Sequence, residues 1–223
     1  MNKTKYYCLL PLMLMAIVMA AMTACSENDT EENDFPNWKE TNDKYFDQLY
    51  AATTTNIMLG DKSWKIIKDW TLDSITASHT YDHVIAHVLT DGQSGVRPFY
   101  GDSVRIHYSG RLIPTEKYTG GYQFDKSWKG EFNEATAVPS QMLVSNSALV
   151  PGFVTTLQNM HLGDKWEVYI PYQLGYDSSA QGSVPAYSTL VFTIELVGVY
   201  RNGADVPSWK SKDNRHQDMW DDE

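Results

Sequence analysis

Between about residues 81 and 200 the chain consists of short segments in which apolar and polar side chains alternate, and Gly, Pro and Asp separate the segments. Successive side chains of a β-strand point to opposite faces, so this pattern predicts half-buried strands. The inward positions of the four clearest strands are Val84, Ala86 and Val88; Val104, Ile106 and Tyr108; Trp166, Val168 and Ile170; and Leu190, Phe192, Ile194 and Leu196. The stretch from Val150 to Met160, with Pro151 near its start, suits a short helix. The pattern predicts an α+β domain, an antiparallel sheet with one helix against one face.

A helical periodicity precedes these segments. It recurs at steps of four, three, four and three through Trp38, Asn42, Tyr45, Leu49 and Ala52. This spacing predicts a helix from about Asn37 to Thr53, and Glu40 three residues after Asn37 is typical of a capping box. We expect the apolar stripe to pack on its own domain, with dimer formation as the alternative. Residues 54–78 contain further side chains that should be buried, in elements whose type the sequence leaves open: Trp64, Ile66, Ile67 and Trp70.

The first 24 residues have the layout of a secretory signal peptide. Lys3 and Lys5 precede an apolar run over residues 8–22, which is short for a membrane-spanning helix of about 20 residues. The small residues directly before Cys25 resemble a bacterial lipoprotein cleavage box, so we expect Cys25 to carry a lipid. The alternative is ordinary cleavage nearby, which would leave Cys25 as a free thiol. Lipidation predicts an outer-membrane lipoprotein on the periplasmic or the cell-surface face.

Removal of residues 1–24 changes the formal net charge from −10 to −12, because two lysines and no acids are lost. A chain this acidic, without a basic patch, is a poor ligand for nucleic acid, and any attachment to a membrane would rely on the lipid. Residues 25–34 are expected to form an acidic linker after Cys25, and such an acidic run also resembles the surface-export signal of some Gram-negative lipoproteins. Residues 201–223 are expected to form a polar, acidic tail.

The sequence lacks the motifs typical of several classes of enzyme. There is no Gly-rich phosphate loop, no nucleophile elbow and no cysteine pair for metal or redox work. His79, His83 and His87 fall four residues apart and would share a helix face, where they could hold zinc. The alternating residues around His83 and His87 instead predict a strand, which would separate the three rings. We therefore expect neither a metal nor a cofactor.

Five sequence motifs occur in order over roughly residues 80–200. They are Gly101-Asp-Ser-Val-Arg-Ile-His-Tyr-Ser-Gly110; Phe124-Asp125; Leu149-Val-Pro-Gly-Phe153; Ile170-Pro171 with Leu174-Gly-Tyr176; and Val184-Pro-Ala-Tyr-Ser-Thr-Leu-Val-Phe192 with Glu195-Leu196. They resemble the motifs of FKBP-type peptidyl-prolyl cis/trans isomerases. The resemblance implies a five- to six-stranded antiparallel half-barrel around a short helix. Residues 79–200 would form this domain, and residues 35–78 an N-terminal helical extension.

The resemblance also implies a site and an activity. Its catalytic residues would be Asp125, Tyr176, Tyr108 and Phe153, and its substrate-binding residues Phe124, Leu149, Val150, Val184 and Phe192. The implied activity is isomerisation of X–Pro bonds in unfolded or extended polypeptides outside the cytoplasm, inhibited by the macrolide ligands of the family. A non-catalytic protein-binding module of the same fold is the alternative, and a chaperone role of the N-terminal helix could accompany either.

This chain departs from the family pattern at several places. Phe153 replaces the tryptophan on which the proline ring rests, Ala186 replaces the second proline of a Pro-Pro pair, and Asp177 replaces a glycine. The chain is several residues longer between Gly110 and Phe124. The segment from residue 128 to 141 is irregular, and Met142 is a candidate for the family's further pocket phenylalanine.

Overall fold

A computed structural model describes residues 34–209 of the chain. The predicted signal peptide, Cys25, the linker up to residue 33 and the tail from residue 210 lie outside the described residues. Within residues 34–209 no helix is long and apolar enough to cross a membrane.

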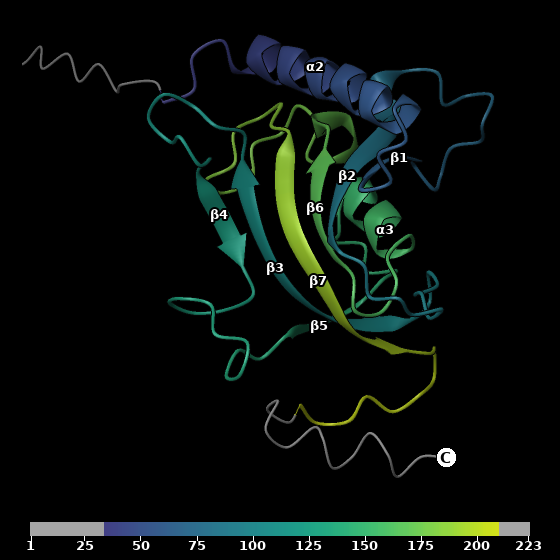
Figure 1. Cartoon of the computed structure of the whole chain (residues 1–223). Helices are drawn as coiled ribbons and strands as arrows, with labels where there is room; N and C mark the ends of the chain where they lie inside the picture. The colour runs from purple at the N-terminus through teal and green to yellow at the C-terminus, as the bar shows by residue number, and fades with distance from the viewer. Residues whose placement is uncertain (1–33, 210–223) are drawn as a thin grey trace, which may run out of the picture. The chain divides into compact units, whose positions relative to one another are not determined.

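One antiparallel sheet forms the centre of the domain (Figure 1). Its seven strands are β1 (Trp64–Lys68), β2 (His83–Thr90), β3 (Ser103–Leu112), β4 (Gln123–Lys126), β5 (Ser140–Leu143), β6 (Lys165–Ile170) and β7 (Leu190–Tyr200). They are ordered β1-β2-β6-β7-β3-β4, and β5 pairs with β3 beside this path. The α+β class and the four strands predicted from alternation are confirmed. The count exceeds five to six because β1, from the predicted N-terminal extension, pairs with β2 along its whole length.

Alternation describes β7 well but β2 poorly. From Phe192 onward, Ile194 and Leu196 are completely buried and the intervening Thr193 and Glu195 are less so, as predicted, whereas Leu190 and Val191 at the start of the strand are both completely buried. In β2, by contrast, Val84, Ile85 and Ala86 are all completely buried, so this strand is covered on both faces. Two helices pack against this part of the sheet.

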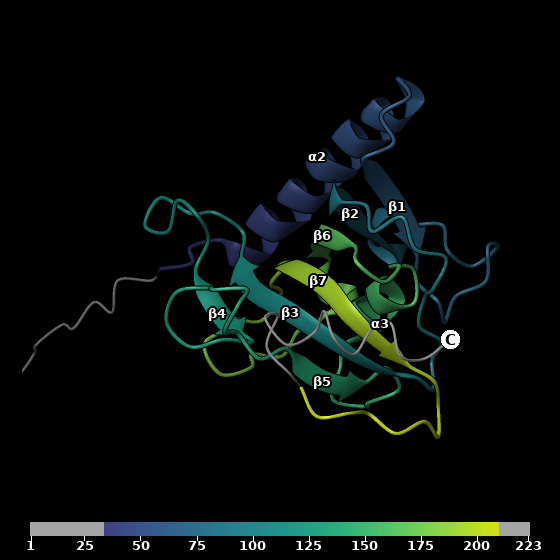
Figure 2. The same cartoon turned by 60° about the horizontal axis from the view of Figure 1, so that its bottom comes forward.

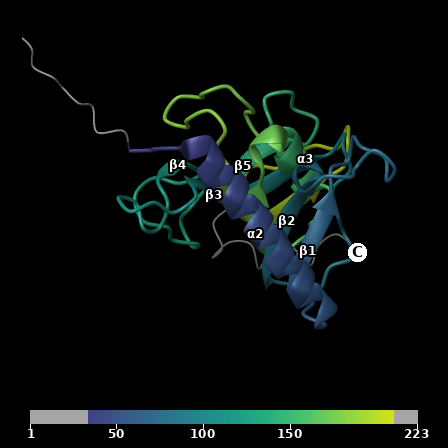
Figure 3. The ribbon, with the colours of Figure 1, turned by 90° about the horizontal axis from the view of Figure 1, so that it is seen from above.

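The first of these helices, α2 (Trp38–Met58), lies across one end of the sheet, as Figure 3 shows from above. Its buried residues are Trp38, Asn42, Phe46 and Thr53. The Tyr45 ring lies 6.4 Å from that of Tyr169, the β6 residue paired with Ile85 of β2. The predicted packing of the helix on its own domain is therefore confirmed.

Three details of α2 differ from the sequence prediction. Ala52 is exposed, and Phe46, outside the predicted stripe, is 3% exposed. The capping box is absent, because Asn37 has a left-handed backbone (φ 48°) and its side chain makes no cap hydrogen bond. The helix also continues past Thr53 to Met58 and stops before Gly60, whose φ of 90° suits a residue just beyond a helix end.

The second helix, α3 (Pro151–Leu157), packs against β2 and β6, as Figure 2 shows from a second side. Every residue of α3 after Pro151 is buried. A Cβ at Gly152 would lie 2.4 Å from Cγ2 of Ile170, so only glycine allows so close an approach to β6. Two short 3₁₀ turns complete the domain, η1 (Thr80–Asp82) and η2 (Tyr172–Leu174).

Candidate active site

Four aromatic rings from different elements meet at the centre of the predicted site. Phe192 of β7 lies 5.0 Å from Phe153 of α3 and 5.6 Å from Phe124 of β4, measured between ring centroids. Tyr108 of β3 lies 6.1 Å from Phe153 and 6.3 Å from Phe192. Most of these pairs are edge-to-face, the arrangement that aromatic rings prefer. The cluster is an apolar surface shared by three strands and a helix.

The strand register explains how the rings come together. Gly110 of β3 is paired with Phe192 on one side and with Asp125 on the other. A Cβ at Gly110 would lie 2.6 Å from the Phe192 ring and 2.7 Å from the Phe124 ring. The glycine that ends the His-Tyr-Ser-Gly motif is thus required, because both rings lie over its backbone.

A polar pair borders the aromatic cluster. The Tyr108 hydroxyl donates a hydrogen bond of 2.9 Å to Oδ2 of Asp125, and the Lys126 backbone N–H donates one of 2.8 Å to Oδ1. Burial of Tyr108, followed by its hydrogen bond to the Asp125 carboxylate, raises the pKa of its phenol far above the ordinary value. Tyr108 therefore stays a neutral donor, and its bond holds the exposed Asp125 carboxylate in one orientation.

Tyr176 follows η2 and lies within electrostatic range of the same pair. Burial, and then the Asp125 carboxylate, raise the pKa of the Tyr176 phenol. The loop after it is fixed by Asp177, where the family has glycine. Asp177 adopts a left-handed backbone (φ 53°) and its N–H donates to the Tyr172 carbonyl at 2.8 Å. Aspartate tolerates this conformation better than most residues, so the departure from glycine leaves the turn intact.

The start of α3 supplies a backbone donor. Val150 is the N-cap residue of this helix, and its carbonyl accepts from the Phe153 and Val154 N–H groups. Among the described residues its own N–H has no hydrogen-bond partner. It is half-buried and packs against the core, as does Leu149. The N–H of Val150 is therefore available to a ligand bound beside Phe153.

Helix α2 is hydrogen-bonded to the loop that precedes β7. The Trp38 Nε1–H donates to Oγ of Ser188 at 2.8 Å, and the Thr189 backbone N–H donates to Oδ1 of Asn42 at 2.7 Å. This loop follows Val184 and leads into Phe192, so α2 helps to position one side of the site. Sequence reasoning missed this role, although Asn42 stood out as the polar member of an apolar stripe.

The predicted site residues are not all equally close to one another. Hydrogen bonds, ring contacts or electrostatic coupling connect six of them: Tyr108, Phe124, Asp125, Phe153, Tyr176 and Phe192. Val184 is a buried member of the general core, at 3% exposure. Met142 lies in β5 opposite Val104, with no ring contact to the cluster among the described residues. His83 and His87 lie in a strand, as predicted, against the rings of Tyr50 and Trp64 respectively.

Comparison with known proteins identifies a family for this arrangement. The model of the family described as FKBP-type peptidyl-prolyl cis-trans isomerase matches residues 95–197. The chain is 35% identical over 113 residues to the FKBP-type 22 kDa peptidyl-prolyl cis-trans isomerase of Escherichia coli, a match that covers 50% of this chain and 48% of that protein. It is 32% identical over 115 residues to FK506-binding protein 1 of Aspergillus oryzae, covering 50% of this chain and 94% of that protein.

A solved structure agrees on the fold. The crystal structure of FkpA from Escherichia coli has a TM-score of 0.52 and 21% sequence identity, and the match covers 91% of this chain and 75% of that one. By sequence, this chain spans about half the length of the Escherichia coli 22 kDa relative.

Proposed function

This chain belongs to the FKBP-type peptidyl-prolyl cis-trans isomerase family, and from that premise we propose that it isomerises X–Pro bonds in unfolded or extended polypeptides. The observation that carries the proposal is the Tyr108–Asp125 hydrogen bond beside the cluster of Phe153, Phe192 and Phe124. It joins an apolar aromatic surface to a carboxylate oriented by a hydrogen bond and to two neutral phenols.

The reaction needs only this kind of site. Rotation about an X–Pro bond has a barrier of about 20 kcal/mol and takes tens to hundreds of seconds without a catalyst. No proton is transferred and no covalent bond breaks, so the site requires neither a nucleophile nor an acid–base pair. In the transition state the amide is twisted and less polarised. A pocket that binds this form better than the planar amide accelerates the reaction.

Each side chain has a role in that pocket. Phe153, held edge-on by Phe192 and Tyr108, forms the floor under the proline ring, and Phe124 and Phe192 form walls. Leu149, Val150 and Val184 extend the apolar surface. Phe153 is 4% exposed in the free protein, so the rim of the pocket must adjust slightly to admit a proline ring.

Polar groups orient the substrate. Tyr176 donates a hydrogen bond to a substrate carbonyl, and the Val150 N–H holds a neighbouring carbonyl. Asp125, oriented by Tyr108, places negative charge near the amide carbon. Both phenols are protonated at physiological pH, because a tyrosine ionises only at about pH 10 and burial raises the pKa of each further.

The N-terminus supports a location outside the cytoplasm. Lys3, Lys5 and the apolar run over residues 8–22 fit an export signal, and Cys25 fits lipid attachment. The protein would act on proline-containing chains that reach the envelope, anchored in the outer membrane on its periplasmic or cell-surface face.

Prolyl exchange measured by NMR tests the activity. A short peptide with a Leu-Pro or Phe-Pro bond should exchange between cis and trans well above the uncatalysed rate in the presence of the purified protein, and a macrolide ligand of the family should block the increase. A folded, monodisperse sample that gives no acceleration would exclude the isomerase and favour the non-catalytic binding module, for which the smaller floor residue Phe153 is the specific observation.

A further inference from the structure

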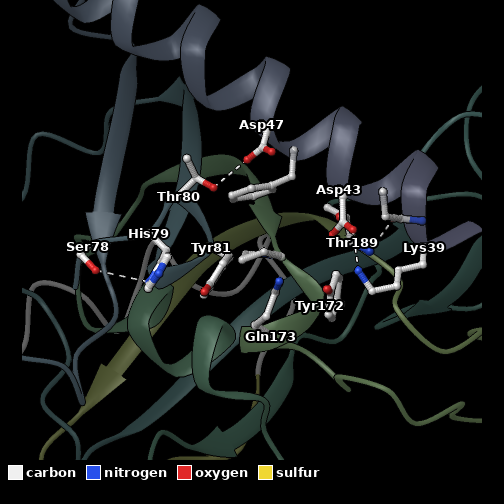
Figure 4. A pocket seen from close by; sticks show the side chains of 13 residues that line it. Lys39, Asp43, Asp47, Ser78, His79, Thr80, Tyr81, Tyr172, Gln173 and Thr189 are labelled. Atoms are coloured by element: carbon white, nitrogen blue, oxygen red, sulfur yellow. Dashed lines mark hydrogen bonds and ion pairs between the residues drawn. The ribbon is translucent and has the colours of Figure 1, made fainter. Parts of the chain in front are cut away.

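A second cavity lies between α2 and the two 3₁₀ turns, and the prolyl site makes no use of it (Figure 4). Its volume is about 560 Å³, which falls within the range of about 300–1,000 Å³ typical of ligand sites. Asp43 and Asp47 line it from α2, Tyr81 from η1, and Tyr172 and Gln173 from η2. We call this cavity the α2 groove.

Two buried polar atoms belong to the walls of the α2 groove. Thr189 is 1% exposed, and its Oγ1 has no hydrogen-bond partner among the described residues; the same holds for Oε1 of Gln173. A buried polar atom left without a partner costs about 1–3 kcal/mol. Both atoms are covered in the free protein, so a ligand with N–H donors would satisfy them once the Gln173 or Thr189 side chain rotates toward the groove.

The charges in the groove favour a cationic ligand. Lys39 already pairs with Asp43 at 2.6 Å, and its ammonium lies 5.4 Å from the centre of the Tyr172 ring. One corner of the groove is thus a carboxylate–aromatic site with the chain's own cation in place. Asp47 accepts a hydrogen bond of 2.7 Å from the Thr80 hydroxyl, and no cation pairs with it in the part of the chain that the structure describes.

From these contacts we propose that the α2 groove binds an arginine side chain of an extended polypeptide. A guanidinium is planar, carries five N–H donors and stacks on aromatic rings. Paired with the Asp47 carboxylate, it would lie against the exposed part of the Tyr81 ring, which is stacked on His79 at 4.6 Å. After side-chain rotation, its donors would reach the Gln173 amide oxygen and the Thr189 hydroxyl. This inference goes beyond the proposed function, because the groove needs no proline and no catalysis.

The groove also shares backbone segments with the prolyl site. Gln173 lies in the turn that leads to Tyr176, and Thr189 lies in the segment between Val184 and Phe192. A polypeptide bound at both places would be held at two points, which raises the effective concentration of its proline at the pocket.

The test uses two capped peptides without proline, Ser-Ala-Arg-Ala-Ser and the same sequence with citrulline, the neutral isostere of arginine. Both are titrated into the ¹⁵N-labelled protein. We expect the arginine peptide to shift the amide signals of Thr189 and Gln173 saturably, with those of Phe153 unmoved, and the citrulline peptide to bind at least about tenfold more weakly, as for loss of a charged hydrogen bond. Equal affinity for the two peptides would overturn the proposal and indicate a groove for neutral chains.

Matched variants separate the groove from the general acidity of the protein. Asp47→Asn keeps the shape of an exposed side chain and should weaken binding of the arginine peptide at least about tenfold. Asp205→Asn removes an equal charge from an exposed position outside the groove and should leave binding unchanged. Equal effects of the two variants would mean non-specific attraction and would refute the site.

Prolyl exchange is measured on the same samples with an uncharged Leu-Pro peptide, which does not use the groove. Asp47→Asn should leave this exchange at the wild-type rate. If Asp47→Asn loses binding of the arginine peptide but keeps the wild-type exchange rate, the result supports the groove. If the wild-type protein shows no exchange, the result counts only against the isomerase.

Discussion

Replacement of Asn42 by alanine should lower the free energy of unfolding by about 2 kcal/mol. Asn42 is completely buried, and its Oδ1 accepts from the Thr189 N–H at 2.7 Å while its Nδ2 donates to the Trp38 carbonyl at 2.7 Å. The variant leaves the Thr189 N–H buried without a partner, which costs about 1–3 kcal/mol. The Trp38 carbonyl keeps its helical backbone hydrogen bond. Loss of the second bond, from Nδ2 of Asn42, therefore adds only about 0.5–1 kcal/mol. Alanine returns about 0.5 kcal/mol because it is the better helix former.

Urea unfolding followed by tryptophan fluorescence measures this change, with the slope of the transition expected to stay constant. Asn56→Ala is the matched control. Asn56 is half-buried on the same helix, and its side chain makes no hydrogen bond within the described residues, so this variant reports the helix propensity alone. A loss below about 0.5 kcal/mol for Asn42→Ala relative to Asn56→Ala would refute the reasoning that α2 is fastened to the domain through Thr189.

The remaining predictions concern the site, the anchor and pH. Tyr176→Phe should lower turnover of a Leu-Pro peptide about two- to tenfold, as for loss of one neutral hydrogen bond. Asp125→Val and Phe153→Leu should lower it further with an unchanged circular dichroism spectrum; unchanged turnover in Asp125→Val would show that the pocket is wrongly assigned. Cys25→Ser should move the protein from the membrane to the soluble fraction, and continued membrane attachment would exclude the lipid anchor. The pKa of Tyr108 is raised in the folded state, so its contribution to stability is complete below about pH 10 and is lost as the pH rises further, because the unfolded phenol ionises first. Tyr108→Phe should remove part of that alkaline loss in pH-dependent unfolding, and an identical profile would contradict this account.

The sequence predicted four strands whose apolar and polar residues alternate, although burial in β2, β3 and β6 does not alternate in the same way. In β7 one face meets the core and the other is more exposed, so alternation was visible. In β1 all five residues are half-buried, and Trp64, Ile66 and Ile67 gave no period from which a strand could be recognised. For β2 the strand itself was predicted, but its burial on both faces depends on α2 and α3 and could not be foreseen from the strand's own residues.

Helix α2 shows a different limit. A stripe at alternating steps of four and three averages 3.5 residues per turn, whereas an α-helix has 3.6, so the stripe drifts around a straight helix by about 20° per seven residues. At the far end of the stripe, the buried position is therefore Thr53, which is completely buried, and not the predicted Ala52. The identity of Asn42 hinted at a specific bond, but its partner Thr189 is 147 positions away, and one sequence cannot reveal such a pairing.

The candidate site residues were predicted from the order of the sequence motifs, and the distances between them come from the structure. Sequence resemblance alone proposed Asp125 and Tyr108, which prove to be hydrogen-bonded. It contained no signal for the α2 groove, because Asp47, Tyr81 and Gln173 come from three separate segments that only the packing of α2 brings together.

The bond between Trp38 and Ser188 spans 150 positions of the chain, and this has a consequence for biogenesis. A chain exported with its N-terminus first delivers α2 to the new compartment long before the loop that receives it. Until that loop follows, the Trp38 indole N–H has no Ser188 hydroxyl to bind, and closing so long a loop is slow. For a chain exported as proposed above, completion of the fold would wait for the last strand to cross, and α2 would be open to proteases and chaperones in that interval.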